Sequence, residues 1–228
     1  NPILQQFFVF TFPERHDKMC SYLYFSFLRG QTMDSNFFAL ISRMRYIARW
    51  GLMRNALPEN IQEHSHMVAV LAHALGVIRR DIFHQPCDVN ALATAALYHD
   101  ASEILTGDLP TPIKYHNAEI MSAYHAVEDL AVQKLLGMLP PELRETYADV
   151  LAEDKDGDIY PLVKAADKLS AYIKCIEERK AGNNEFLSAE AQTRAALEAS
   201  PLPEVQYFLE HFIPAFERDL DELGAIGQ

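Results

Sequence analysis

The chain has 228 residues, of which 49% are hydrophobic, and a formal net charge of −12. This length supports one sizeable core rather than two full domains. Such an acidic chain is a poor partner for polymeric nucleic acid, whose phosphates require a basic surface. It contains no apolar run of about eighteen residues, so we expect no membrane-spanning helix. The three cysteines fit neither a disulfide framework nor a zinc finger, which indicates free thiols in a reducing, cytoplasmic compartment.

Residues 1–32 differ in character from the rest of the chain. Aromatic residues crowd this segment without helical periodicity, and no basic stretch precedes its apolar run at residues 4–12, as it would in a signal peptide. A regular helical pattern begins directly after Met33. We therefore interpret residues 1–32 as an appendage, upstream of a start at Met33, to a domain of residues 33–228. The alternative is a short strand or arm that packs on a partner subunit.

Residues 33–228 have a helical pattern almost throughout, and no segment alternates convincingly as a strand would. Asn60 followed by Glu63 is the pattern of a capping box, and Asp88 or Asn90 can cap the next helix. We expect a single all-α domain of about seven to nine helices. The expected helices cover residues 35–50, 60–80, 90–105, 117–138, 140–153, 161–180, 186–199 and 203–222, with a proline-containing loop at 107–112.

The histidines differ in their position around the predicted helices. At about 100° per residue, His64 lies on the same stripe as Val68 and Leu71 and therefore points into the core. His66 and His73 lie on the opposite side of that helix and are expected to face solvent. An inward histidine by itself is more typical of a hydrogen-bonded core residue than of a metal ligand.

The next helix adds ionisable groups to an apolar face. His99 and Glu103 are one turn apart and share a face with Ala95 and Ala96, and Asp100 lies beside them. Such groups are costly to bury without partners, and the small alanines allow another helix to approach closely. Imidazole and carboxylate are suitable ligands for a divalent metal, and a further carboxylate can transfer protons. The alternative is a buried polar network, or a helix end that opens into water.

Helical phase does not select Asp167. The apolar stripe of its helix is defined by Leu162, Leu169 and Ile173, and Asp167 is not central to that stripe. From the pattern alone, Asp167 is a surface acid.

The order His64, His99-Asp100, Asp167 resembles the H…HD…D signature of the HD-domain metal-dependent phosphohydrolases. The flanking residues are more specific, and together they resemble the bacterial 5′-deoxynucleotidases of the YfbR type. The resemblance extends from about Met33 to near the C-terminus. The matching segments are Arg49-Trp50, Arg54-Asn55, Glu59-Asn60, Glu63-His64-Ser65, Tyr98 to Glu103, Thr106 to Pro112, Lys164 to Asp167, Glu177-Glu178 and Ala181 to Glu185.

The resemblance implies one divalent metal bound by four side chains of this sequence. They are His64, His99, Asp100 and Asp167. Two imidazoles and two carboxylates leave positions for water and a phosphate oxygen, so the metal would lower the pKa of the water and polarise the phosphorus. Mixed nitrogen and oxygen ligands accept manganese, cobalt, zinc, iron or copper, so the metal's identity stays open.

The resemblance also implies roles around the metal. Glu103 matches the family's catalytic carboxylate, which moves protons. Arg49 has the planar fork that suits phosphate, and Trp50 orients it; Trp50 can also be a buried core aromatic. Asp108 matches a residue near the sugar and phosphate, or one that assists acid–base chemistry, and the sequence does not decide between these roles. The expected substrate-binding residues are Arg49, Trp50, His64, Asp100, Asp108, Leu109, Pro110, Thr111 and Asp167.

The reaction implied is hydrolysis of a 2′-deoxyribonucleoside 5′-monophosphate to deoxynucleoside and phosphate by a homodimeric enzyme. The loop stiffened by Pro110 and Pro112 would form the wall that excludes a ribose 2′-hydroxyl. One alternative keeps the fold and the metal but changes the substrate to a nucleoside triphosphate, a cyclic nucleotide or an alarmone. Another is a non-catalytic metal-binding helical module, against which Glu103 argues, because a purely structural site needs no spare carboxylate.

Overall fold

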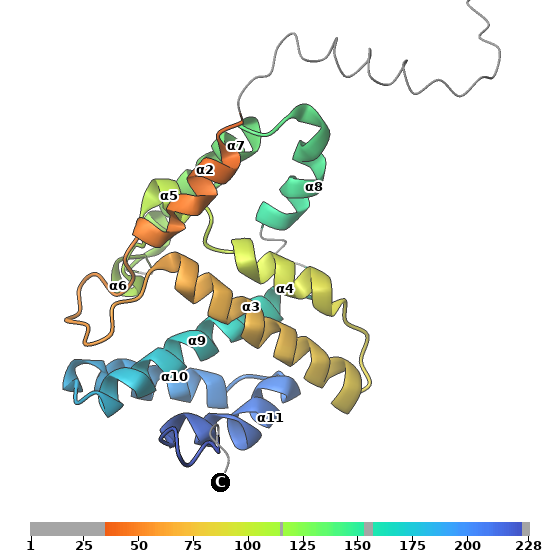
Figure 1. Cartoon of the computed structure of the whole chain (residues 1–228). Coiled ribbons are helices and arrows are strands. Elements are labelled where there is room, and N and C mark those ends of the chain that lie inside the picture. The colour runs from red at the N-terminus through yellow and green to blue at the C-terminus, as the bar shows by residue number, and fades with distance from the viewer. Residues whose placement is uncertain (1–34, 115, 153–156, 225–228) are drawn as a thin grey trace, which may run out of the picture. The chain divides into compact units, whose positions relative to one another are not determined.

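The computed structural model describes residues 35–114, 116–152 and 157–224. Within these ranges all regular elements are helical, which confirms the all-α prediction, and Figure 1 shows their arrangement. The interpretation of residues 1–32 as an appendage lies outside the described residues. The α-helices are α2 (Phe37–Ile41), α3 (Ile61–Val77), α4 (Val89–Tyr98), α5 (Glu103–Thr106), α6 (Thr111–Lys114), α7 (Ala118–Gly137), α8 (Pro141–Leu151), α9 (Tyr160–Lys180), α10 (Leu187–Glu198) and α11 (Pro203–His211).

Shorter helical turns extend or connect these helices. The 3₁₀ turns are η2 (Ser42–Tyr46), η4 (Asn184–Phe186) and η5 (Ile213–Glu217), and the π-helical turn η3 (Ile78–Ile82) continues α3. The N-terminus of α3 is fixed by the predicted capping box. Asn60 Oδ1 accepts hydrogen bonds from the N–H groups of Gln62 and Glu63 at 3.0 and 3.1 Å, and the Glu63 carboxylate accepts from the Asn60 N–H.

Two apolar clusters form the core. The larger one joins α3, α4, α9, α10 and α11, with fully buried members such as Leu75, Leu92 and Leu169. The smaller one joins α2, α7 and α8 around Phe37 and Leu135, and it includes Ala101, just beyond α4. On α4 the chain leaves the larger cluster after Ala96, and Tyr98 and Ala101 then contribute to the smaller one. The residues between, His99 and Asp100, therefore lie at the junction of the two clusters.

The first predicted helix ends earlier than expected. It becomes a 3₁₀ turn and stops at Tyr46, after which Ala48 and Asn60 form an isolated antiparallel bridge. Trp50 has a left-handed φ of 58°, which no helix can accommodate and which is costly for a bulky side chain. Residues 49–59 therefore form a loop, closed at its base, and we refer to it below as the 49–59 loop.

Two further helices also end before their predicted limits. α4 stops at Tyr98 because the N–H groups of Ala101 and Glu103 bond to carbonyls three residues back instead of four. α11 stops at His211, and the chain continues in the 3₁₀ turn η5, which contains Pro214. Proline lacks the N–H that an α-helix requires and clashes with the preceding turn. The break at α4 matters for function, because it separates His99 and Asp100 from Glu103.

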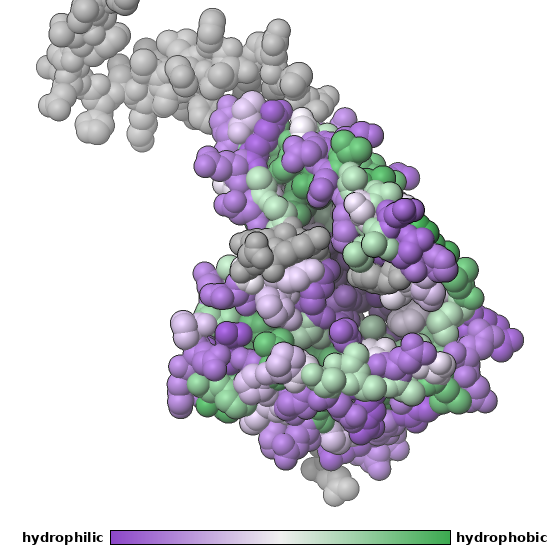
Figure 2. Space-filling view, turned by 180° about the vertical axis from the view of Figure 1, so that it is seen from behind, coloured by the Kyte–Doolittle hydropathy of each residue, from purple (hydrophilic) through white to green (hydrophobic). Residues whose placement is uncertain are grey.

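The described surface is mainly hydrophilic on the face shown in Figure 2, where hydrophobic residues are dispersed among polar ones. None of the helices in the described ranges is both long and apolar enough to cross a membrane.

Candidate metal and phosphate site

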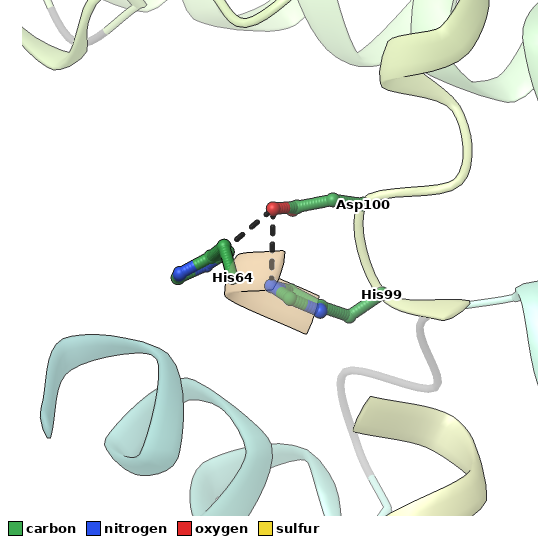
Figure 3. A group of neighbouring side chains, drawn as sticks. All are labelled: His64, His99 and Asp100. Atoms are coloured by element: carbon green, nitrogen blue, oxygen red, sulfur yellow. Dashed lines mark ion pairs between the residues drawn. The ribbon is translucent and has the colours of Figure 1, made fainter. Parts of the chain in front are cut away.

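Three side chains meet where α3 passes the end of α4. His64 projects from α3, and His99 and Asp100 follow α4 directly (Figure 3). Asp100 Oδ2 lies 3.2 Å from His99 Nε2 and 3.6 Å from His64 Nε2. One possible ligand atom from each residue lies within 4.8 Å of the others, which is compact enough to hold one metal ion.

The two imidazoles are oriented so that their Nε2 atoms face the centre of the cluster. His99 Nδ1 lies 2.8 Å from the Ala96 carbonyl, so this nitrogen carries a proton, and in the neutral imidazole Nε2 keeps its lone pair. His64 Nδ1 lies 3.2 Å from Ser170 Oγ on α9. Among the described residues, both Nε2 atoms are buried without a hydrogen bond of regular geometry. Buried nitrogens that lack a regular hydrogen bond are costly, and a cation bound between them and the carboxylates would satisfy both, so these residues fit a metal.

Asp167 on α9 lies beside this cluster. Its Oδ1 is 3.0 Å from His64 Nε2, although its side chain remains 35% exposed. The structure thus brings together all four residues that the resemblance selects, including the one that helical phase assigns to the surface. Asp167 reaches His64 from the edge of the apolar stripe, next to Ser170, which contacts the other nitrogen of the same ring.

The pKa values in the cluster reflect strong mutual interaction. Burial alone would raise the pKa of Asp100 and of Asp167, but the neighbouring imidazoles hold both well below the ordinary carboxyl range. Burial alone would lower the pKa of His99, but the Asp100 carboxylate raises it above its usual value. Both carboxylates are therefore ionised at neutral pH and available as ligands.

Glu103, the first residue of α5, behaves differently from these two acids. Its side chain is buried, and Oε2 has no hydrogen-bond partner among the described residues. Burial, followed by the charges of Asp100 and Asp108, raises the pKa of Glu103 to about 10. In the protein without metal, this residue is therefore a neutral carboxylic acid at pH 7, which can donate a proton.

Arg49 and Trp50 stand at one side of the cluster, and one carboxylate binds both. Glu59 Oε2 accepts from Arg49 Nε at 3.2 Å and from Trp50 Nε1 at 3.1 Å. Arg49 Nη1 also lies 3.4 Å from Asp100 Oδ2, and the indole packs on Phe186 with ring centroids 5.2 Å apart. Glu59 is a residue to which the sequence assigned no role, because an acid next to an N-cap is a common helix-start feature.

The predicted substrate loop lies partly within the site. Burial, the largest effect, raises the pKa of Asp108, and nearby Arg49 and the Trp50 backbone N–H act in the opposite direction. Leu109 and Pro110 are partly buried, whereas Thr111 is exposed at the start of α6. The structure therefore connects Asp108 to the Arg49–Trp50 pair, and it places Thr111 towards solvent.

Comparisons with known proteins place the chain in a family. A family model described as 5′-deoxynucleotidase YfbR-like matches residues 36–216. 5′-Deoxynucleotidases YfbR from Shigella boydii and Escherichia coli are each 50% identical over 192 residues, covering 84% of this chain and 96% of theirs.

Solved structures give the same fold. An HD-domain phosphohydrolase from Listeria innocua has a TM-score of 0.71 and 26% identity, covering 79% of this chain and 88% of its own. An HD phosphohydrolase of cyanophage S-2L, bound to dA and one catalytic Zn²⁺ ion, has a TM-score of 0.51 and 26% identity, covering 81% of this chain and 96% of its own. The family match spans most of the chain, and the relatives match over nearly their whole length. The chain therefore belongs to the YfbR-like family of 5′-deoxynucleotidases.

Proposed function

We propose that this protein is a metal-dependent phosphohydrolase that converts 2′-deoxyribonucleoside 5′-monophosphates to deoxynucleoside and phosphate. The observation that carries the proposal is the pair of buried nitrogens, His64 Nε2 and His99 Nε2, which make no hydrogen bond of regular geometry and face the Asp100 carboxylate next to Arg49. The 50% identity to 5′-deoxynucleotidases supports the same reaction.

His64, His99, Asp100 and Asp167 are the proposed metal ligands. When bound, a divalent metal supplies Lewis acidity, which lowers the pKa of a coordinated water and polarises a phosphoryl oxygen. The ligand set suits zinc, cobalt, manganese, iron or copper, and the cyanophage relative holds zinc.

Arg49 and Trp50 are proposed to hold the phosphate. The Arg49 guanidinium is fixed by Glu59 on one side and by Asp100 on the other, so its remaining N–H groups have a defined direction. These two ion pairs also hold the guanidinium in position when no substrate is bound. Trp50 adds a rigid wall, because its indole is held by Glu59 and by Phe186.

Glu103 is the proposed proton donor. Departure of the deoxynucleoside leaves its O5′ with a negative charge, and a neutral carboxylic acid beside it provides the proton. Asp108 is proposed to bind the sugar side of the substrate or to share this proton transfer, from its position against the Trp50 backbone. Leu109, Pro110 and Thr111 complete the proposed wall beside the deoxyribose.

Three broader proposals accompany this function. The catalytic domain is proposed to comprise residues 33–228, with residues 1–32 as an appendage. A homodimer and a cytoplasmic location are the expected state and compartment. Sedimentation of the purified full-length protein and fractionation of its host cells test these two expectations directly.

Phosphate release from a panel of nucleotides tests the proposed function. The protein is treated with a chelator, and manganese, cobalt and zinc are added back separately. The panel pairs dAMP with AMP and includes 3′-dAMP, dATP and a cyclic nucleotide. Metal-dependent release from dAMP but not AMP is the expected result. Release from dATP or the cyclic nucleotide alone would keep the metal-dependent hydrolysis but assign a different substrate. No release with any metal would favour a non-catalytic module.

A further inference from the structure

The 49–59 loop is held at its base and at its tip, in addition to the side-chain contacts of Arg49 with Asp100 and of Trp50 with Phe186. At its base, the Arg49 N–H donates to the Glu59 carbonyl at 3.0 Å, next to the bridge between Ala48 and Asn60. At its tip, residues 54–57 are bound by α9 and the turn that follows it. Most side chains of the tip are exposed, so the tip is held mainly through its backbone.

Glu178 is the centre of the contacts at the tip. Its carboxylate has no exposed surface and accepts from the N–H groups of Ala56 and Leu57 at 2.8 and 3.0 Å and from Asn183 Nδ2 at 2.8 Å. Lys174, one turn earlier on α9, pairs with Glu178 at 2.5 Å and donates to the Leu57 carbonyl. The two charged groups of this buried pair therefore bond to each other and to three backbone groups, the N–H groups of Ala56 and Leu57 and the carbonyl of Leu57.

The same face of α9 also contacts the metal cluster. Asp167, Ser170, Lys174 and Glu178 are spaced three, four and four residues apart, so they lie along one side of the helix. The first two contact the two ring nitrogens of His64, and the last two bind the tip of the 49–59 loop. A single rigid helix therefore sets the position of the metal cluster relative to the loop that begins with Arg49 and Trp50.

We propose that the Lys174–Glu178 pair positions Arg49 and Trp50, the first two residues of the 49–59 loop, against the metal cluster. The pair therefore determines how well these two side chains orient the phosphate for reaction. This inference rests on the proposed function. Glu178 is a positioning residue here, because it acts through the loop and touches neither the substrate nor the metal ligands. Loosening the loop tip would leave the four ligands in place but would detach the loop from Glu178, so that the guanidinium and the indole would be positioned only by their contacts with Glu59, Asp100 and Phe186.

A double-mutant cycle with full-length protein tests this positioning role. The variants are Glu178→Gln, Arg49→Ala and the pair, and Glu190→Gln is the matched control. Glu190 accepts from Arg179 on α9 at 2.9 Å, but it joins α9 to α10 and forms no hydrogen bond or ion pair with the described residues of the loop. The readouts are KM and kcat for dAMP, together with metal affinity from titration of the metal-free protein.

Glu178→Gln is expected to raise KM for dAMP about tenfold or more while metal affinity changes less than about twofold. In the Arg49→Ala background, the same change should alter kcat/KM by a clearly smaller factor, because only Trp50 remains to be positioned. Glu190→Gln should behave like the wild type. Equal effects in both backgrounds, a parallel loss of metal affinity, or the same defect in the control would overturn the inference.

A second variant covers the case in which Glu178→Gln does not fold. Asn183 lies at the edge of the network and donates to the Arg54 carbonyl at 2.6 Å and to Glu178 at 2.8 Å, so Asn183→Ala loosens the tip from a partly exposed position. It should show the same dependence on Arg49.

If the wild type proves inactive on dAMP, the proposed function fails separately. Amide hydrogen exchange at Ala56 and Leu57 and binding of inorganic phosphate to the metal-loaded protein then decide the loop inference. Glu178→Gln or Asn183→Ala should speed the exchange and weaken phosphate binding, and unchanged values for both would overturn it.

Discussion

Arg49 Nη1 lies 3.4 Å from Asp100 Oδ2, so the proposed phosphate-binding cation contacts a proposed metal ligand directly. The same guanidinium binds Glu59 through Nε at 3.2 Å. A phosphate bound by Arg49 would therefore lie next to the metal, because no other residue separates the guanidinium from the proposed metal ligand Asp100. This proximity is the basis on which the effects of substitutions in the site can be separated into metal binding, phosphate binding and proton transfer.

Glu103→Gln is expected to lower kcat by roughly 10²-fold or more while metal content stays near that of the wild type. Glutamine keeps the shape of this buried side chain but has no acidic proton to donate. Metal analysis of the purified variant measures the metal content, and steady-state kinetics with dAMP measures kcat. A loss of metal instead would reassign Glu103 as a ligand.

Asp167→Ala is expected to abolish activity and to weaken metal binding, although Asp167 is the most exposed of the four proposed ligands. Its carboxylate lies 3.0 Å from His64 Nε2, so its removal takes one charged donor from the site. Activity with excess metal and the metal dissociation constant are the measurements. Full activity in this variant is incompatible with a four-ligand site. Asp158→Ala, on the segment before α9, serves as a control for loss of an acid nearby in sequence.

Glu59→Gln is expected to raise KM for dAMP by about tenfold, with a smaller effect on kcat. One oxygen of Glu59 accepts from both Arg49 and Trp50, and a neutral amide oxygen binds a guanidinium less strongly than a carboxylate does. Comparison of dAMP with deoxyadenosine as a competitive inhibitor distinguishes the phosphate from the nucleoside. The inhibition constant of deoxyadenosine should change little, and an equal loss for both would place the defect outside the phosphate site.

Removal of the metal is expected to lower the melting temperature as well as to stop turnover. A ligand present at 100 times its dissociation constant stabilises the folded protein by about 2.7 kcal/mol. Metal affinity should fall as the pH is lowered, because the raised pKa of His99 makes protons compete for the same nitrogen. Thermal unfolding with and without chelator at pH 6 and pH 8 measures both effects. A chelator-independent melting temperature would mean that no metal was bound in the folded protein.

Stability at acid pH should depend on Glu178. Burial alone would raise the pKa of this carboxyl, but Lys174 and the N–H groups of Leu57 and Ala56 lower it to about 2. Because the folded-state pKa lies below the ordinary value of 4.5, this carboxylate stabilises the fold above about pH 4.5, and that contribution is lost as the pH falls towards 2. Urea unfolding of the wild type and of Glu178→Gln between pH 7 and pH 3 provides the measurement. The wild type should lose more stability than the variant over this range, and parallel curves would show that Glu178 does not titrate in this way.

The parts of the site that could be predicted from the sequence are those that depend on local helix patterns. His64 is identified by phase alone, because its helix has a clear apolar stripe and a capping box that fixes where the helix begins. Asp167 could be selected only through the resemblance to a family, since it lies at the edge of its stripe and reaches the cluster sideways. The all-α class followed from periodicity in the same way, whereas the early ends of α4 and α11 depend on local hydrogen bonding and on Pro214.

Contacts between segments that are far apart in the sequence could not be predicted from helical periodicity. Lys174 and Glu178 have the spacing and opposite charges of an exposed surface pair, and they are buried only because a segment about 120 positions away in sequence covers them. Glu59 is similar, since its two side-chain donors are brought to it by a loop that turns at Trp50 with a left-handed φ. Neither relationship leaves a periodic signal in the chain.

The way α9 holds the tip of the 49–59 loop has an evolutionary consequence. Glu178 and Lys174 recognise N–H and carbonyl groups, which every residue except proline provides, and the side chains of Leu52 and Leu57 point largely into solvent at 71% and 46% exposure. Substitutions at the outer positions of this loop therefore preserve its attachment. Single mutations can therefore change the chemistry of this outward-facing surface while the backbone contacts that hold the loop to α9 stay the same.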